Sequence, residues 1–182
     1  MNEKKYPVLL PLLLLTFAMI VEFVCRCGNT QEIENKSNIF YKINKLSRKK
    51  LKKEYVLKLE KNIKKYSKKY SIPEEIIITI IYTESSFKIN ASGDHGRSLG
   101  LMQTGRLARK YCKLSCGAYD SDSVDNQICL GTCWLSYAIE RCKTLKAGLT
   151  AYAGGKCKAQ NARVEWAVRR RFRIYRRLKN EK

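Results

Sequence analysis

The chain has 182 residues, of which 45% are hydrophobic, and this is enough to build the core of a single domain. Its 37 lysines and arginines outnumber 16 acidic residues, and the net charge of +21 predicts adhesion to acidic partners such as cell-wall polymers, anionic lipid or nucleic acid. His95 is the single histidine, which argues against a histidine-based metal site or catalytic triad.

The N-terminus has the pattern of an export signal. Two lysines precede a stretch that is apolar over residues 8–24 except for Thr16 and Glu22. Residues 1–27 are therefore predicted to be a secretory signal peptide. The apolar run is short for a membrane span of about 20 residues, and an uncleaved membrane anchor is the alternative.

The next segment differs in composition. Residues 28–56 are polar at first and dense in lysine over residues 45–53, which is typical of a linker or basic arm. The predicted folded domain covers residues 57–182. Its first hydrophobic side chains recur at helical spacing and are Leu59, Ile63, Tyr66 and Tyr70.

A second helix is predicted from residue 73 onward. Pro73 suits the first helical position, and Glu74 and Glu75 complement the positive end of the helix dipole. Residues 76–81 are mostly β-branched and would form a buried strand on propensity alone. The proline and the acidic first turn favour a helix.

Glu84 lies on the apolar stripe of this helix, four residues after Ile80 and seven after Ile77. Desolvation and the negative end of the helix dipole both raise the pKa of a carboxyl group in such a place, which keeps it protonated near neutral pH. Glu84 is therefore a candidate general acid. The alternative is a glutamate at the helix end that points to solvent.

Residues 91–100 contain three glycines and form a predicted loop that can bring its backbone close to a ligand. Gln103 follows the loop with an amide that can hold a sugar acetamido or hydroxyl group. An ordinary surface turn is the alternative interpretation. Within the loop, Asp94 either points into a cleft or bonds the backbone of its own turn, and turn chemistry favours the second role.

Four short motifs follow one another along the chain: Glu84-Ser85-Ser86-Phe87, Ala91-Ser92, Gly100-Leu101-Met102-Gln103 and Ala151-Tyr152. Together they resemble the lytic transglycosylases of the soluble-type (SLT) domain, within the lysozyme-like superfamily. The resemblance covers roughly Leu57 to Leu178 and implies an all-α, mainly helical fold. Lys61 to Tyr70 would form the helix before the catalytic one, and Val164 to Leu178 the closing helix.

The resemblance also implies roles in a site. Glu84 would be the acid, Gly100 to Gln103 the turn at the substrate cleft, and Tyr152 an aromatic hydroxyl near the acid. No cofactor and no metal are expected. The predicted substrate-binding residues are Ser85, Asp94, Met102, Gln103 and Tyr152.

The chain departs from the family pattern in two places. Ala153 stands where the family usually has asparagine, so a polar contact to substrate or loop is expected to be missing. Residues 93–98 also look like goose-type lysozyme, in which an aspartate at the position of Asp94 has been linked to positioning water. A second aspartate is expected after the turn, where this chain has Thr104 and Gly105. Hydrolysis therefore stays open beside transglycosylation.

Cleavage after Cys27 would leave an even set of cysteines, as expected for an exported, disulfide-stapled domain. Cys112 and Cys116 are four residues apart, as are Cys129 and Cys133, which is the spacing of two thiols on one helix face. Two such helices that pack antiparallel can be joined by two disulfides, and this is one of about fifteen possible pairings. The last pair would then close the segment around Tyr152. A four-cysteine zinc site is the rival, and the spacing and the export signal disfavour it. The set is Cys112, Cys116, Cys129, Cys133, Cys142 and Cys157.

Most glycosidases use two carboxylates, whereas this chain has one well-placed acid and one doubtful aspartate. A single acid suffices if Glu84 protonates the glycosidic oxygen, the sugar's acetamido group stabilises the cation, and Glu84 then takes the proton of the C6 hydroxyl. The product is a 1,6-anhydro sugar, and N-acetylmuramic acid has both groups. The resemblance therefore implies a lytic transglycosylase that cleaves between N-acetylmuramic acid and N-acetylglucosamine, and this chemistry fits it. The alternatives are a hydrolytic goose-type-like lysozyme and a non-enzymatic cationic cell-wall-binding or antimicrobial protein.

The expected location is secreted or periplasmic, with membrane anchoring as the alternative. The expected partners are peptidoglycan glycan strands, and anionic cell-wall polymers or a membrane surface that bind basic patches. No specific nucleic acid is expected, and the protein is expected to be a monomer. The densest basic patch lies on the closing helix and comprises Arg169, Arg170, Arg171, Arg173, Arg176 and Arg177.

Overall fold

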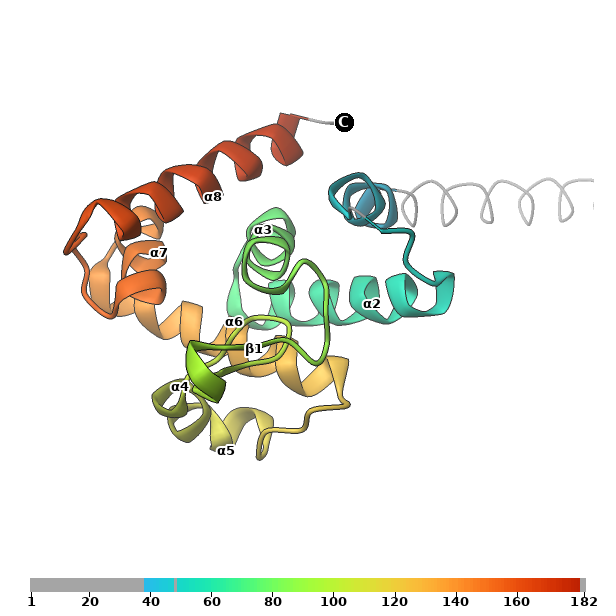
Figure 1. The fold of residues 1–182 in the computed structure, drawn as a ribbon, viewed down its shortest axis with the longest axis horizontal. Coiled ribbons are helices and arrows are strands. Elements are labelled where there is room, and N and C mark those ends of the chain that lie inside the picture. The colour runs from blue at the N-terminus through green and yellow to red at the C-terminus, as the bar shows by residue number, and fades with distance from the viewer. Residues whose placement is uncertain (1–37, 48, 181–182) are drawn as a thin grey trace, which may run out of the picture. The chain divides into compact units, whose positions relative to one another are not determined.

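Helices make up nearly all of the secondary structure, as predicted (Figure 1). The computed structural model describes residues 38–47 and 49–180, so the predicted signal peptide lies outside the described residues. Residues 38–46 are helical. The helices that follow are α2 (Lys53–Tyr70), α3 (Glu74–Ser85), α4 (Arg106–Tyr111), α5 (Lys113–Cys116), α6 (Val124–Cys142), α7 (Leu145–Gly154) and α8 (Ala162–Asn180).

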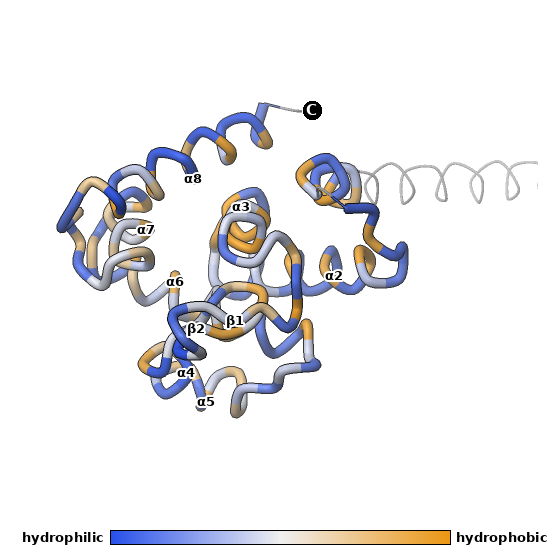
Figure 2. Tube along the Cα trace, in the orientation of Figure 1, coloured by the Kyte–Doolittle hydropathy of each residue, from blue (hydrophilic) through white to orange (hydrophobic). Residues whose placement is uncertain are grey.

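Helix α3 is the buried centre of the fold, and both α2 and α8 pack against it (Figure 1). Each of residues 76–81 is at most 1% exposed. Figure 2 shows α3 as predominantly hydrophobic and α8 as predominantly hydrophilic. A helix that is apolar all round is stable only when other elements cover every face, and here the neighbouring helices do so. The β-branched run is therefore helical, and the strand alternative is wrong.

Helix α3 ends directly after Glu84, in a sharp change of direction. Ser86 adopts a left-handed conformation with φ of 51°, and its N–H donates to the carbonyl oxygen of Tyr82 at 3.0 Å. Phe87 also has a positive φ, and its side chain is 2% exposed. Burial of the Phe87 ring fixes the turn. The carboxylate of Glu84 consequently stays in the last helical turn while the backbone leaves.

The stretch expected to be a linker contributes to the core. Ile39 and Ile43 are 3% and 0% exposed, and Lys42 forms an ion pair of 2.8 Å with Glu75. Val56, near the start of α2, is also fully buried. Residues 39–47 and 49–56 thus belong to the packed domain, and the boundary predicted at residue 57 is too late. Among the described residues, no helix has the length and apolar character required to cross a membrane.

Three disulfides tie the described part of the chain together, and they have the pairing that the spacing suggested. Cys112–Cys133 and Cys116–Cys129 join the α4–α5 segment to α6, and Cys142–Cys157 closes the segment that contains α7. Because these cysteines are bonded to one another, the zinc alternative is wrong. One detail differs from the prediction, since Cys112 lies at the break between α4 and α5 and not on one continuous helix with Cys116.

The glycine-containing loop forms a small hairpin. Strands β1 (Ser92–Gly93) and β2 (Ser98–Leu99) pair antiparallel, with a 3-10 turn, η1 (Asp94–Gly96), between them. Gly93 allows a close approach, because a Cβ at this position would lie 2.4 Å from Oε1 of Gln103. The hairpin is thereby held against the turn that carries Gln103.

Candidate active site

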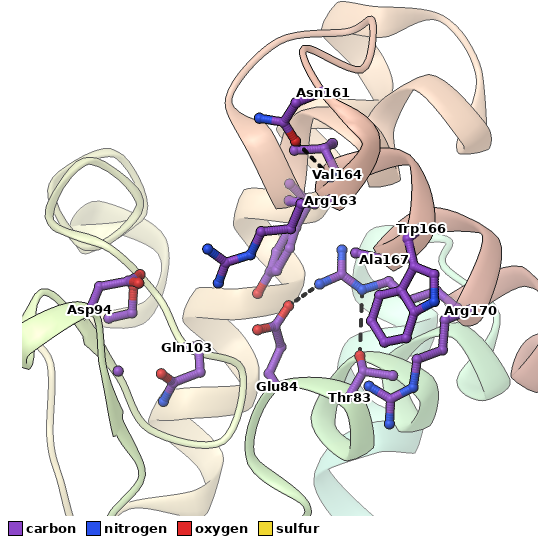
Figure 3. A pocket seen from close by; sticks show the side chains of 15 residues that line it. Thr83, Glu84, Asp94, Gln103, Asn161, Arg163, Val164, Trp166, Ala167 and Arg170 are labelled. Carbon is purple, nitrogen blue, oxygen red and sulfur yellow. Dashed lines mark hydrogen bonds and ion pairs between the residues drawn. The ribbon is translucent and has the colours of Figure 1, made fainter.

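Glu84 lines a cavity of about 540 Å³ between the hairpin and helix α8 (Figure 3). Its side chain is 20% exposed, so the carboxylate reaches the cavity from an otherwise buried helix. Glu84 therefore occupies the position that the sequence predicted, on the apolar stripe and at the edge of a cleft. Other lining residues include Thr83, Gly93, Asp94, Ser98, Gln103, Tyr152, Ala153, Asn161, Arg163, Trp166, Arg170 and Arg171.

Arg171 of α8 forms an ion pair with Glu84. Its guanidinium is almost completely buried, and its side chain also donates to Oγ1 of Thr83 at 3.4 Å and to the carbonyl oxygen of Leu149 at 3.5 Å. Arg171 thus links helices α3, α7 and α8 at the carboxylate. The sequence analysis counted it among the six arginines of the basic patch on the closing helix, and its burial separates it from the exposed ones.

A signal in the sequence could have identified Arg171. Val168, Phe172 and Tyr175 define the apolar stripe of α8, and Arg171 lies three residues after the first and four before the last. It is therefore on the buried stripe, as Glu84 is on that of α3. A charged residue on each of two apolar stripes is an indication that the two pair with each other.

The electrostatics of Glu84 combine opposing effects. Burial is the largest and raises the pKa of its carboxyl group, while the positive charge of Arg171 lowers it. Asp94 raises this pKa and Arg170 lowers it, both by smaller amounts, and the net result is a pKa above the ordinary value. Glu84 is consequently easier to protonate than an exposed glutamate, and Arg171 limits the rise in its pKa.

Tyr152 lies close to the acid but does not bond to it. Its hydroxyl donates to the carbonyl oxygen of Met102 at 2.7 Å, and its ring centre is 5.8 Å from the guanidinium carbon of Arg171. Burial and the charge of Glu84 both raise the pKa of the Tyr152 hydroxyl, which is therefore neutral. Tyr152 thus anchors α7 to the turn beneath the cavity and supports Arg171 from one side.

The amide of Gln103 holds its own turn together. Gln103 has a φ of 47°, and its Nε2 donates to the carbonyl oxygens of Ala91 at 3.0 Å and Gly100 at 2.9 Å. The side chain still lines the cavity beside the hairpin (Figure 3). The nitrogen of the amide is thus used for the architecture of the turn.

Asp94 lies across the cavity from α8 (Figure 3). Its Oδ2 accepts a hydrogen bond of 2.7 Å from the hydroxyl of Ser98, and its carbonyl oxygen accepts one of 3.0 Å from Nε of Arg97. Asp94 therefore combines the two roles considered from the sequence, since it stabilises its turn and also borders the cavity.

Two predicted substrate-binding side chains do not line this cavity. Ser85 is buried and donates to the carbonyl oxygen of Ile81 at 3.0 Å, as a serine inside a helix commonly does. Met102 is fully buried and fills the space next to Gly131, where a Cβ would lie 2.4 Å from its sulfur. The structure places the side chains of Ser85 and Met102 in the packed interior, and their contact with substrate stays a prediction.

A second hollow of about 600 Å³ adjoins the first, because both are lined by Ser98, Gln103 and Tyr152. Its outer wall includes Trp134, a residue that the sequence analysis did not select. Trp166 similarly borders the first cavity and is 63% exposed. One indole ring thus lines each of the two adjoining hollows.

Comparison with known proteins identifies this architecture. The transglycosylase SLT domain matches residues 61–168, which is more than half of the chain. Among solved structures, an inactive mutant of the lytic transglycosylase Slt from Pseudomonas aeruginosa is similar, with 16% identity and a TM-score of 0.58. The match covers 67% of this chain and 24% of that protein, so the chain spans about a quarter of its length. No curated protein matches the chain. The chain belongs to the transglycosylase SLT domain family and has an all-α fold of the lysozyme-like superfamily.

Proposed function

We propose that the protein is a peptidoglycan lytic transglycosylase that cleaves between N-acetylmuramic acid and N-acetylglucosamine and releases a 1,6-anhydro product. The observation that carries this proposal is the position of Glu84, a half-buried carboxylate with a raised pKa at the wall of a cavity large enough for sugar rings. The membership of the chain in the SLT family supports the substrate class.

In the proposed first step, protonated Glu84 gives its proton to the glycosidic oxygen, and the bond from that oxygen to C1 of N-acetylmuramic acid breaks. The acetamido oxygen of the sugar stabilises the positive charge at C1. In the second step, the C6 oxygen attacks C1 and its proton passes to the Glu84 carboxylate. The enzyme returns to its starting protonation state, and no water is consumed.

Arg171 fits both steps as a positioning residue. It holds the carboxylate against α8 in the free protein, and its charge stabilises the anionic form of Glu84 that exists between the two proton transfers. The burial of Glu84 provides the opposite tendency and favours the acid form that the first step needs. The two effects together keep the carboxyl group able to give and to take a proton.

Hydrolysis is the second candidate function, because Asp94 borders the same cavity and could orient a water molecule. The hydrogen bond from Ser98 occupies one oxygen of Asp94, and one aspartate holds a water molecule less well than two aspartates do. We therefore favour transglycosylation. A non-catalytic role in cell-wall binding is the third candidate, supported by the basic surface of α8 and by Ala153, which gives the cavity no polar side chain where the family usually has asparagine.

We infer further that the protein acts outside the cytoplasm, because its proposed substrate and its disulfides both belong there. Residues 1–27 would direct export, and the domain that follows would act as a monomer on glycan strands. Basic surfaces outside the cavity would hold the protein on anionic cell-wall polymers or on a membrane surface.

Digestion of purified peptidoglycan by the Glu84→Gln variant tests this proposal. The amide keeps the shape of the side chain but cannot transfer the proton, so cleavage should fall by at least about 10²-fold while the circular dichroism spectrum is unchanged. Glu74→Gln is the matched control, since it makes the same change at the opposite end of α3 and should retain activity. Cleavage by Glu84→Gln within about tenfold of the parent would contradict the role of this residue.

A further inference from the structure

Three arginines of α8 border the cavity around Glu84, but only Arg171 has a carboxylate partner (Figure 3). Arg163 makes no hydrogen bond or ion pair with any residue that the structure describes. Arg170 faces two aromatic rings, with its guanidinium carbon 5.6 Å from the ring centre of Trp166 and 5.8 Å from that of Tyr82. Two guanidinium groups at the cavity therefore have no anionic partner among residues 38–47 and 49–180.

Neither carboxylate that lines the cavity pairs with Arg163 or Arg170 in the part of the chain that the structure describes. Glu84 pairs with Arg171, and one oxygen of Asp94 accepts the hydrogen bond from Ser98. In Figure 3 the side chain of Arg163 extends into the space that Glu84 and Asp94 border, and does not turn away from it. Arg163 and Arg170 are thus available to a ligand in the cavity.

Positive charge at this place opposes the proposed chemistry. Arg170 lowers the pKa of Glu84, which weakens the acid form that the first step requires. An anion bound at the two guanidinium groups would neutralise this effect. The arrangement therefore suits a substrate that brings its own negative charge to the site.

We propose that Arg163 and Arg170 form a subsite for a carboxylate carried by the glycan strand, next to the bond that is cleaved. This inference rests on the proposed function and specifies its substrate. A guanidinium group matches a carboxylate with two parallel hydrogen bonds, and a partly desolvated cavity strengthens such bonds. Two sources supply this chemistry in peptidoglycan: the free lactyl carboxylate of N-acetylmuramic acid and the carboxylates of its stem peptide.

The subsite would make the enzyme selective for charged glycans. A neutral polymer of N-acetylglucosamine would leave both guanidinium groups unpaired in the complex, and unpaired charged groups in a binding site discriminate against such ligands. Trp166, between the two arginines in sequence and largely exposed, offers an apolar ring face at the same wall.

Binding to three glycan preparations tests the subsite. The first keeps its stem peptides, the second has lost them to an amidase and carries free lactyl carboxylates, and the third has every carboxylate converted to a methylamide. Dissociation constants are measured in the Glu84→Gln background, so that cleavage does not interfere. Adding Arg163→Gln or Arg170→Gln should weaken binding about tenfold, the effect expected for loss of a charge-assisted hydrogen bond.

The preparations distinguish the sources. Weakening confined to intact strands assigns the stem-peptide carboxylate, and weakening confined to stripped strands assigns the lactyl carboxylate. The neutral strands should show less than about a twofold change, because no charge is left to recognise. Arg173→Gln is the control, since it removes an exposed arginine of the same helix that does not line the cavity.

Three results would overturn the subsite: equal weakening on neutral strands, an equal effect of Arg173→Gln, or no effect of either cavity variant. The first two would indicate general adhesion of a basic surface. Failure of the proposed function gives a different result, namely that the parent protein cleaves none of the preparations. The binding measurements still decide the subsite in that case, because they do not depend on turnover.

Discussion

Replacement of Arg171 by glutamine tests the link between the structure and the protonation of Glu84. The substitution removes the cation that pairs with the carboxylate and leaves a shorter side chain whose amide can still lie near Thr83. Burial then acts on Glu84 with less opposition, so the pKa of Glu84 should rise further above its ordinary value. A more persistent acid form should move the high-pH limit of activity to higher pH.

The size of the effect on stability follows from burial. Removal of one partner of a buried ion pair costs about 3–5 kcal/mol, because the other charge stays behind without compensation. The side chain of Glu84 is 20% exposed and can take up a proton, so we expect a smaller loss of about 2 kcal/mol at pH 7. In a chain of this length this corresponds to a melting temperature lower by about 4–8 °C.

The loss should depend on pH in a definite direction. A carboxyl group whose folded-state pKa lies above its unfolded value makes the folded state bind more protons, so stability falls as pH rises through the window between the two values. Arg171→Gln extends this window upward. The difference in melting temperature between variant and parent should therefore be large at neutral pH and shrink toward acidic pH, where Glu84 is protonated in both.

Calorimetric melting and cleavage rates, each measured across pH 4–9 on both proteins, provide the assay. Arg169→Gln is the matched control, since Arg169 forms a surface ion pair with Glu165 in which the side chains are 73% and 54% exposed. Such surface pairs contribute about 0–1 kcal/mol to the free energy of unfolding, so this control substitution should change the melting temperature little. A stability loss in Arg171→Gln that is the same at every pH, together with an unmoved high-pH limit, would refute the reasoning.

Three further predictions concern two residues near Glu84 and the disulfides. Asp94→Asn should lower stability or rate only modestly and leave the cleavage product unchanged, because Ser98 can still donate to the amide oxygen; digestion products compared by mass spectrometry check this. Tyr152→Phe should cost about 1–2 kcal/mol of unfolding free energy, since it leaves the carbonyl oxygen of Met102 without its partner, and denaturant titration measures the loss. Thiol titration of the mature protein in denaturant without reductant should find none of its six cysteines free, and two or more reactive thiols would contradict the pairing.

Local spacing in the sequence predicted the parts of the fold that depend on near neighbours. The acidic first turn after Pro73 and the position of Glu84 on the stripe of Ile77 and Ile80 gave helix α3 and its half-buried carboxylate. Cysteines four residues apart likewise predicted the two disulfides that join α6 to the α4–α5 segment. These features are encoded within one or two helical turns, where periodicity decides which face a side chain occupies.

Long-range pairing was harder to predict, and Arg171 illustrates why. It lies 87 residues from Glu84 in sequence, within a run of arginines that is typical of a solvated surface. Ile39 and Ile43 were missed for a similar reason, because the lysine-rich segment after them is typical of a linker while they pack into the core. Charge density hid the apolar spacing in both places.

Motif membership also did not determine which side chains line the cavity. Ser85 follows Glu84 directly, but successive residues of a helix point about 100° apart, so Ser85 enters the core while Glu84 reaches the cavity. Met102 precedes Gln103 in the cleft turn and packs under it, where Gly131 leaves room. A motif identifies which residues the fold needs, and burial decides which of them touch a ligand.

Mass spectrometry of purified peptidoglycan digested by the parent protein tests the central proposal most directly. Attack by the C6 hydroxyl at C1, with Glu84 as acid and then base, predicts strands that end in 1,6-anhydro-N-acetylmuramic acid and weigh one water less than strands with reducing ends. Digestion in water enriched in ¹⁸O should leave these ends unlabelled, because no water enters the product. Predominant reducing ends that carry ¹⁸O would show that water is the acceptor, and the protein would then be a lysozyme.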